Sequence, residues 1–252
     1  MYTTALLTAL LSATALAAPV EQQLEKRACP GVHIFGARET TASPGYGSAG
    51  AVVNKILAAH SGSTAEAISY PACGGGSACG GVSYSNSVQQ GTKAVVAAVS
   101  NFAKSCPSTE IVLVGYSQGS EIFDNALCGN GDPKQGLSAS AAGSIASYNI
   151  KAAIFMGDPR FEVGAPYNVG TCKAGGFSSR PSGQTCGNYN SKIQSYCDAA
   201  DREYPDRSGY REVEPELTFM VAYCCNGNNA ATHNGYANEY GSKALTFVNS
   251  KL

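Results

Sequence analysis

The sequence predicts an α/β fold with a central, mostly parallel β-sheet covered by helices on both faces. Apolar runs of strand length alternate along the chain with longer segments whose apolar residues recur at helical spacing. Two runs, IVLV at 111–114 and AAIFM at 152–156, are apolar throughout, as expected for strands buried on both faces. Functional residues of such folds lie beyond the carboxyl ends of the strands.

The N-terminal half supplies two expected strands and two expected helices. Residues 32–38 (VHIFGAR) are rich in β-forming side chains, and residues 45–60 place apolar side chains at helical spacing. A second β-rich run at 64–72 is stopped by Pro71, which has no N–H to donate to a sheet. Residues 85–106 form a long amphipathic pattern that opens on small polar residues, as helix N-termini do.

The C-terminal half continues the same alternation. The run at 108–119 is an expected buried strand, and a helical pattern at 118–128 follows it directly. A second buried strand is expected at 151–160, a shorter one at 191–197, and a closing helix at 235–252. This order is typical of βαβ units and therefore of a parallel sheet.

The N-terminus has the pattern of a secretion signal. Residues 6–16 are an apolar run too short to cross a bilayer, and Ala15-Leu16-Ala17 offers the small residues that signal peptidase requires. We expect a signal peptide at 1–17, a pro-segment at 18–27 that ends in Lys26-Arg27, and a single domain at 28–252. The net charge of −1 gives no reason to expect a nucleic acid or a membrane surface as partner, and we expect a monomer.

The cysteines agree with an extracellular location. All ten follow the expected cleavage site, and an even number in a secreted chain indicates disulfides, here five. No metal site is expected, because no Cys-x-x-Cys pair occurs and the chain has only three histidines.

Gly115-Tyr116-Ser117-Gln118-Gly119 is a G-x-S-x-G motif directly after a buried strand and before a helix. This context predicts a nucleophile elbow, a strained turn that raises the Ser117 hydroxyl above the sheet. Side chains at 115 and 119 would collide with neighbouring backbone. The turn also places the Gln118 N–H at a helix N-terminus, where it can bind a developing oxyanion.

A serine nucleophile needs a base. His33 lies inside an expected strand and is interpreted as a core residue, and His60 ends an expected helix, where an imidazole beside the helix dipole is a common structural choice. His233 lies in a Gly- and Asn-rich loop just before the last helix and follows Ser117, which is the order in α/β-hydrolases. We therefore predict His233 as the base.

The acid is expected between Ser117 and His233. Apart from the acids of a charged segment at 202–222, the candidates are Asp124, Asp132, Asp158, Asp198 and Asp201. Asp124 falls on the helix after the motif and is expected to point away, and Asp158 precedes a proline and could serve a turn. Asp198 and Asp201 follow the last strand, at the sheet edge where such an acid belongs. The residue pattern does not separate these two.

At these residues the chain resembles the fungal acetylxylan esterases and their relatives the cutinases, carbohydrate esterase family 5. The similarity covers essentially all of 28–201 and 223–252. It is carried by the segments HIFGARETTASPGYG, YPACGGGSACGGVSYSNSV, IVLVGYSQGSEI, ALCGNGDP, KAAIFMGDPRF, KIQSYCDAAD and YCCNGNNAATHNGYANEYGS.

The resemblance implies a three-layer α/β/α sandwich of the cutinase-like α/β-hydrolase type. It implies Ser117 as nucleophile, His233 as base, Asp201 as acid, and Thr40 as the partner of the Gln118 amide in the oxyanion hole. It further implies an enzyme without a cofactor that removes acetyl groups from acetylated xylan. The expected disulfides are Cys29–Cys106, Cys73–Cys79, Cys197–Cys224, Cys128–Cys186 and Cys172–Cys225.

One segment departs from the family pattern. The resemblance implies Asp-Pro-x-Cys at the acid, whereas here residues 202–222 stand in place of one proline between Asp201 and Tyr223. Codons at the two ends of the segment can contain an intron donor and acceptor, and excision would keep the reading frame and restore the proline. We favour a translated, unspliced intron over a genuine surface loop, because loops of this length are uncommon. If the insertion is real, we expect a much lower kcat.

Two other functions remain open. The first is a cutinase-like esterase that acts on longer acyl esters, although the Gly-rich polar stretch at 73–87 favours acetylxylan esterase. The second is a catalytically impaired secreted homologue that binds polysaccharide. Ser117 and His233 argue against it, and only the interrupted acid region argues for it.

Overall fold

The computed structural model describes residues 29–201 and 223–252. The expected signal peptide at 1–17, the pro-segment at 18–27 and the insertion at 202–222 lie outside the described residues. No helix in the described part of the chain is long and apolar enough to cross a membrane.

The core of the fold is one six-stranded sheet in which every described strand pairing is parallel. The spatial order is β2-β1-β3-β4-β6-β5, so β3 and β4 are the central pair, with β1 and β2 on one side and β6 and β5 on the other. The strands are β1 (Val32–Ala37), β2 (Thr64–Ala67), β3 (Glu110–Tyr116), β4 (Ile150–Met156), β5 (Asn168–Val169) and β6 (Ile193–Tyr196).

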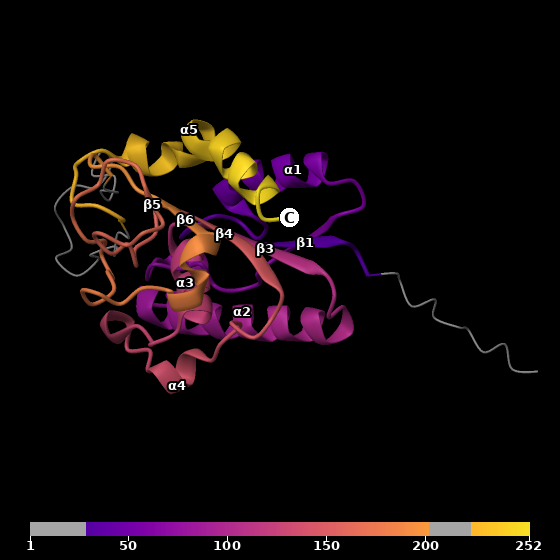
Figure 1. Ribbon diagram of the computed structural model, residues 1–252. Helices are drawn as coiled ribbons and strands as arrows, with labels where there is room; N and C mark the ends of the chain where they lie inside the picture. The colour runs from indigo at the N-terminus through magenta and orange to yellow at the C-terminus, as the bar shows by residue number, and fades with distance from the viewer. Residues whose placement is uncertain (1–28, 202–222) are drawn as a thin grey trace, which may run out of the picture.

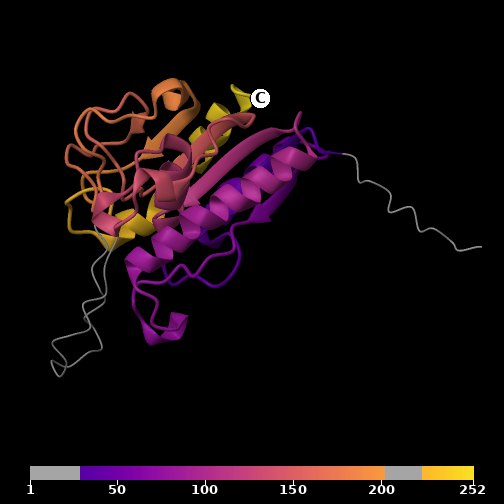
Figure 2. The ribbon, with the colours of Figure 1, turned by 90° about the horizontal axis from the view of Figure 1, so that it is seen from below.

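Helices cover both faces of this sheet and make a three-layer sandwich (Figure 1). Helices α1 and α5 pack together on one face, and α2 and α3 pack together on the other. Seen from below, α2 runs in front of the sheet, roughly along the direction of the strands (Figure 2). The helices are α1 (Gly50–Ala59), α2 (Tyr84–Ser105), α3 (Gln118–Cys128), α4 (Ala139–Ala142) and α5 (Ala230–Asn249), with short 3-10 turns at Gly47–Ala49, Ser77–Cys79, Pro133–Gln135 and Gly187–Lys192. The expected fold class is confirmed.

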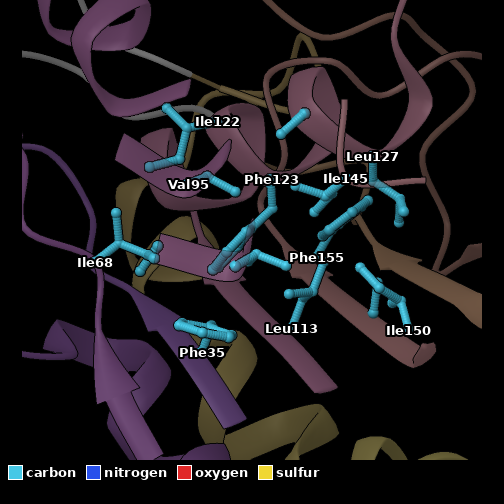
Figure 3. Close-up of a cluster of buried hydrophobic side chains, with 14 of the residues drawn as sticks. Phe35, Ile68, Val95, Leu113, Ile122, Phe123, Leu127, Ile145, Ile150 and Phe155 are labelled. Carbon is cyan, nitrogen blue, oxygen red and sulfur yellow. The ribbon is translucent and has the colours of Figure 1, made fainter. Parts of the chain in front are cut away.

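Two hydrophobic cores explain why the central strands are apolar throughout. Along β3, Ile111 and Leu113 join the core beneath α2 and α3, whereas Val112 and Val114 join the core beneath α1 and α5. Successive strand residues point to opposite faces, so a strand between two helical layers must be apolar at every position. Figure 3 shows Leu113 with Phe35, Phe155, Ile122 and Phe123 in the first of these cores.

Three boundaries differ from those expected by as much as five residues. Helix α1 begins at Gly50 rather than at 45, after a 3-10 turn. Strand β2 ends at Ala67 because the carbonyls of Ile68 and Tyr70 bind the Arg38 guanidinium instead. Helix α5 begins at Ala230 rather than at 235, because the Asn229 side chain caps it by accepting the Ala231 N–H at 2.9 Å. His233 therefore lies inside the helix and not in a loop before it.

Five disulfides connect the described part of the chain. They coincide with the five expected pairs, namely Cys29–Cys106, Cys73–Cys79, Cys128–Cys186, Cys172–Cys225 and Cys197–Cys224. Two of them anchor the segments on either side of Asp201. Cys197–Cys224 joins these two segments to each other, and Cys172–Cys225 ties the second one to the loop after β5.

Candidate active site

Ser117 occupies a sharp turn between β3 and α3 at the carboxyl end of the sheet. Its backbone angles are φ 51° and ψ −122°, which is an unusual conformation for a residue with a side chain. A Cβ at Gly115 would lie 2.6 Å from Ser120 Cα, and one at Gly119 would collide with the Ala37 carbonyl. Both glycines are therefore required by close backbone approach, as the nucleophile-elbow interpretation predicts.

The structure brings Ser117, His233 and Asp201 together. His233 Nε2 lies 3.0 Å from Ser117 Oγ, and His233 Nδ1 lies 2.9 Å from Asp201 Oδ2. The three residues are 1%, 2% and 0% exposed. Both ring nitrogens of the histidine are thus engaged at hydrogen-bond distance, one with a hydroxyl and one with a carboxylate. This arrangement can take a proton from the serine and stabilise the resulting imidazolium.

Helix α5 and its neighbours fix His233 from several sides. The Tyr116 hydroxyl donates to the His233 carbonyl at 2.6 Å and so ties the first turn of α5 to the end of β3. Gly157, at the end of β4, has φ +62° and leaves room for the ring, because a Cβ there would lie 2.9 Å from His233 Cε1. The end of β3 therefore holds the His233 backbone, and the end of β4 leaves the space that its ring occupies.

The two aspartates after β6 have different roles in the structure. Asp198 accepts the backbone N–H of Thr171 at 2.9 Å and its hydroxyl at 2.8 Å, so it joins two loops. Asp201 accepts the Cys224 N–H at 3.0 Å on Oδ1 and contacts His233 through Oδ2. The geometry places Asp201, and not Asp198, beside the histidine.

The other acidic candidates lie in a buried ionic cluster next to α3. Asp124 pairs with Arg180, Asp132 pairs with Arg160 at 3.1 Å, and Asp158 accepts the Arg160 N–H at 2.9 Å in a turn. Asp124 is 1% exposed, so the expectation that it points away from the site holds, but it points into this cluster and not into solvent. These pairs hold the 158–180 loop against α3.

The remaining histidines are structural, as expected. His33 stacks on Phe102 and contacts the Thr64 hydroxyl through Nδ1 at 2.7 Å. His60 follows the last residue of α1, and its Nε2 lies 2.9 Å from Asn249 Oδ1.

Thr40 lies in the segment after β1, which passes close to the turn at Ser117, since a Cβ at Gly119 would lie 2.7 Å from the Arg38 carbonyl oxygen. Gln118 is the first residue of α3, so its backbone N–H has no acceptor within the helix. Its side chain is held by the Ser87 hydroxyl at 2.8 Å and by the Cys73 carbonyl at 3.2 Å. The Thr40 hydroxyl oxygen is buried without a hydrogen-bond partner among the described residues. A buried hydroxyl left unpaired is costly unless a ligand completes it.

Burial shifts the pKa of several groups around the site. Burial, together with the nearby Asp201 carboxylate, raises the pKa of Tyr236 far above that of an exposed phenol. Tyr236 therefore stays neutral and donates its hydroxyl hydrogen to Asp201 Oδ2 at 2.7 Å. Burial also raises the pKa of Glu121 well above its usual range, with Asp132 adding to the effect. Glu121 is hydrogen-bonded by the Tyr84 hydroxyl.

The groups of sulfur and carboxylate atoms that lie close enough for a metal ion all contain disulfide-bonded cysteines. In the described chain these groups are Cys172, Cys197 and Cys225, and Asp124, Cys128 and Cys186. Oxidised cysteines do not supply thiolate ligands.

The sequence did not reveal Tyr236, Gly157 or Asn229. The helical spacing of His233 and Tyr236 was a usable signal, but the helix was predicted to begin after His233. The contact of Gly157 with the ring depends on the approach of two distant segments, which no local pattern encodes.

The fold and the site define this protein as an α/β hydrolase. Its parallel sheet has helices on both faces, and a strained serine follows the end of β3. The family model described as Cutinase matches residues 28–209, and this chain belongs to the cutinase family. The resemblance predicted from the sequence is confirmed. The matched range ends within 202–222, before His233.

Named relatives and solved structures agree with this assignment. The chain is 58% identical to Acetylxylan esterase 2 of Talaromyces purpureogenus over 245 residues, which covers 96% of each chain. It is 55% identical to Cutinase 11 of Verticillium dahliae over 254 residues, covering 100% of this chain and 78% of that protein. The structure matches the catalytic core domain of acetyl xylan esterase from Trichoderma reesei with a TM-score of 0.77 and 54% identity, covering 89% of this chain and 100% of that one. These matches confirm the expectation that the chain is an esterase.

Proposed function

We propose that this protein is a secreted serine esterase that removes acetyl groups from acetylated xylan through an acyl-enzyme. The observation that carries the proposal is the chain of contacts from Ser117 Oγ through the His233 ring to Asp201 Oδ2. The names of relatives that are more than half identical over nearly the whole chain support the substrate class.

The first half of the reaction forms the acyl-enzyme. His233 Nε2 accepts the hydroxyl proton of Ser117 as Oγ attacks the acetyl carbonyl, and Asp201 stabilises the imidazolium. The oxyanion is bound by the Gln118 N–H and by Thr40, whose hydroxyl is otherwise unpaired among the described residues. The C–O bond to the sugar then breaks, and the sugar alcohol leaves with the proton from His233.

The second half releases acetate. Water enters, gives a proton to His233 Nε2 and attacks the acyl carbonyl, and the same oxyanion donors stabilise the second tetrahedral intermediate. Collapse of this intermediate breaks the bond to Ser117 Oγ and returns the proton to the serine. No cofactor takes part in this scheme.

Acetate release from acetylated xylan tests the proposal. The wild-type protein should release acetate, and Ser117→Ala should reduce the rate by a factor on the order of 10⁶ while the fold is retained. Labelling of the wild type by a fluorophosphonate at Ser117 separates this proposal from that of a catalytically impaired polysaccharide-binding homologue. A folded wild-type protein without labelling and without acetate release would favour the homologue.

A cutinase-like esterase for longer acyl chains is the second candidate, favoured by the 55% identity to Cutinase 11. The two candidates share the chemistry at Ser117 and differ in the acyl group accepted. Relative kcat/KM values on p-nitrophenyl acetate, butyrate and longer esters separate them. A preference for chains longer than four carbons would favour the second candidate.

We further propose export through the signal peptide at 1–17, removal of the pro-segment at 18–27, and action of residues 28–252 as one monomeric catalytic domain. The five disulfides of the described chain support an oxidising location. N-terminal sequencing of protein secreted by the native host should give Ala28 as the first residue. Sedimentation of that protein should give the mass of a single copy.

The insertion at 202–222 is proposed to be an unspliced intron. The observation behind this proposal is that Asp201 and Tyr223 flank the segment where the family pattern has one proline. Sequencing of reverse-transcribed message across the junction decides between the two explanations. Transcripts that mostly lack the segment support the intron, and transcripts that mostly keep it support a genuine loop.

A further inference from the structure

Helix α5 carries two tyrosines on the same face as His233. Tyr236 and Tyr240 follow His233 at helical spacing, so the three side chains form one stripe along the helix. The stripe faces the segment after β6, because all three side chains contact Asp198 or Asp201 there. One element thus presents both the histidine and two phenol hydroxyls to the two aspartates.

Each tyrosine holds a different carboxylate. Tyr240 donates to Asp198 Oδ2 at 2.9 Å. Tyr236 donates to Asp201 Oδ2 at 2.7 Å, on the same oxygen that faces His233 Nδ1. The Tyr236 oxygen also accepts the Asp198 N–H at 2.9 Å, and this contact directs its single hydrogen at Asp201.

The Asp201 carboxylate is consequently held on both oxygens. The Cys224 N–H binds Oδ1 at 3.0 Å, and the Tyr236 hydroxyl binds Oδ2. Two donors on opposite oxygens fix the plane of a carboxylate, which one donor cannot do. The side chain is fully buried, so each of these contacts acts in a medium of low dielectric constant, where it is stronger than in water.

We propose that Tyr236 is a positioning residue for the esterase reaction, which keeps Asp201 Oδ2 directed at His233 Nδ1. The inference rests on the proposed function, since it takes Asp201 as the acid of the triad. Because Tyr236 and His233 are on the same helix, the helix itself sets the distance between the base and the group that orients the acid. This anchor does not depend on residues 202–222, which begin directly after Asp201.

The chain offers a matched control for the test. Tyr236→Phe and Tyr240→Phe each remove one hydroxyl from the same helix face, and each removes a donor to a carboxylate. Asp201, the carboxylate that Tyr236 binds, contacts His233, whereas Asp198, the carboxylate that Tyr240 binds, does not. We expect Tyr236→Phe to lower kcat by roughly 10-fold or more with KM within about twofold, and Tyr240→Phe to leave both constants within about twofold.

A double-mutant cycle with Asp201→Ala distinguishes positioning from a general loss of stability. In the Asp201→Ala background the change Tyr236→Phe should alter kcat by less than about twofold, because no carboxylate remains to be positioned. A Tyr236→Phe loss that persists in full in that background would overturn the proposal, as would a Tyr236→Phe enzyme with wild-type kcat. If Asp201→Ala itself keeps full activity, the proposed function fails instead.

A second measurement covers the case in which Tyr236→Phe does not fold. Replacing Tyr236 by a fluorotyrosine keeps the ring nearly unchanged in size and strengthens the hydroxyl as a donor. The low-field proton resonance of His233 Nδ1–H should then shift, whereas the same replacement at Tyr240 should leave it in place. An unchanged resonance in the protein fluorinated at Tyr236 would contradict the proposal.

Discussion

At the scale of single residues, the site depends on backbone conformations that a side chain resists. Ser117 has φ 51° and ψ −122°, and Gly157, beside the imidazole, has φ +62°. The strain at Ser117 is maintained by the strand and helix on either side of it. Gly157 is different, because a glycine adopts its conformation without strain and the absent side chain leaves space for His233.

We predict that Gly157→Ala lowers kcat by more than its loss of folding stability can explain. The new Cβ would lie 2.9 Å from His233 Cε1 and would displace the ring from Ser117. Gly164 is a matched control, since its φ is +83° and a Cβ there would meet nothing within 4 Å. Both variants should lose about 1–2 kcal/mol in chemical denaturation, but only Gly157→Ala should lose 10-fold or more in kcat. Equal kcat in the two variants would contradict the prediction.

His33 should make stability fall in mild acid. Burial lowers its pKa from 6.5 to about 4, so between these values the unfolded chain binds a proton that the folded chain does not. The free energy of unfolding should therefore decline as the pH falls through 6.5 and level off near 4, with a loss of about 2 kcal/mol between pH 7 and pH 5.

Urea unfolding at the two pH values measures this loss. His33→Gln should remove most of the decline, since glutamine does not titrate and its amide can still bond the Thr64 hydroxyl. His60→Gln, a change at the histidine that follows α1, should retain it. The prediction is wrong if His33→Gln and the wild type lose the same free energy between pH 7 and pH 5.

At the scale of elements, the first turn of α5 links helix capping to the site. The Asn229 side chain accepts the Ala231 N–H at 2.9 Å, and His233 lies in the turn that this cap begins. We predict that Asn229→Ala costs about 1 kcal/mol in thermal or chemical unfolding and also lowers kcat, because the frayed turn carries the base. Asn229→Asp keeps an acceptor at the cap and should restore both values. A stability loss without any change in kcat would show that the position of His233 does not depend on the cap.

The strands, the elbow and α5 together show how far the sequence could predict the structure. The apolar runs at 111–114 and 152–156 identify buried strands, because a strand between two helical layers has no polar face. The glycines at 115 and 119 identify the elbow for an equally local reason. The start of α5 was missed because Asn229 and two alanines extend it through a Gly- and Asn-rich region that resembles a loop.

The choice of acid marks the limit of local patterns. Asp198 and Asp201 follow the same strand three positions apart and could not be separated from residue types alone. Both carboxylates contact α5, so what separates them is the residue that each meets there: Asp201 lies beside His233, whereas Asp198 binds Tyr240 and Thr171. These are tertiary contacts, and only the family resemblance carried the information in advance.

At the scale of the whole molecule, the site is held by covalent and hydrogen-bonded contacts on both sides of residues 202–222. The Gly227 N–H donates to the Asp201 carbonyl at 3.0 Å, the Cys197–Cys224 disulfide joins the two flanking segments, and Cys172–Cys225 ties the second of them to the loop after β5. None of these contacts involves the inserted residues. The expectation that the insertion lowers kcat stays a prediction. Because these contacts remain when the insertion is present, we expect a reduced kcat and not a complete loss of activity.

We predict that replacing residues 202–222 by a single proline raises kcat on p-nitrophenyl acetate by about 10-fold, a factor that a misplacement of Asp201 well below 1 Å would produce. The longer form should keep measurable activity, because Cys224 N–H and the Tyr236 hydroxyl still hold the carboxylate. Unfolding free energies should differ by no more than about 1 kcal/mol, since the entropy of closing a loop grows slowly with its length. Equal rates in the two forms would show that these anchors suffice without the short loop, and complete inactivity of the longer form would show that they do not hold Asp201.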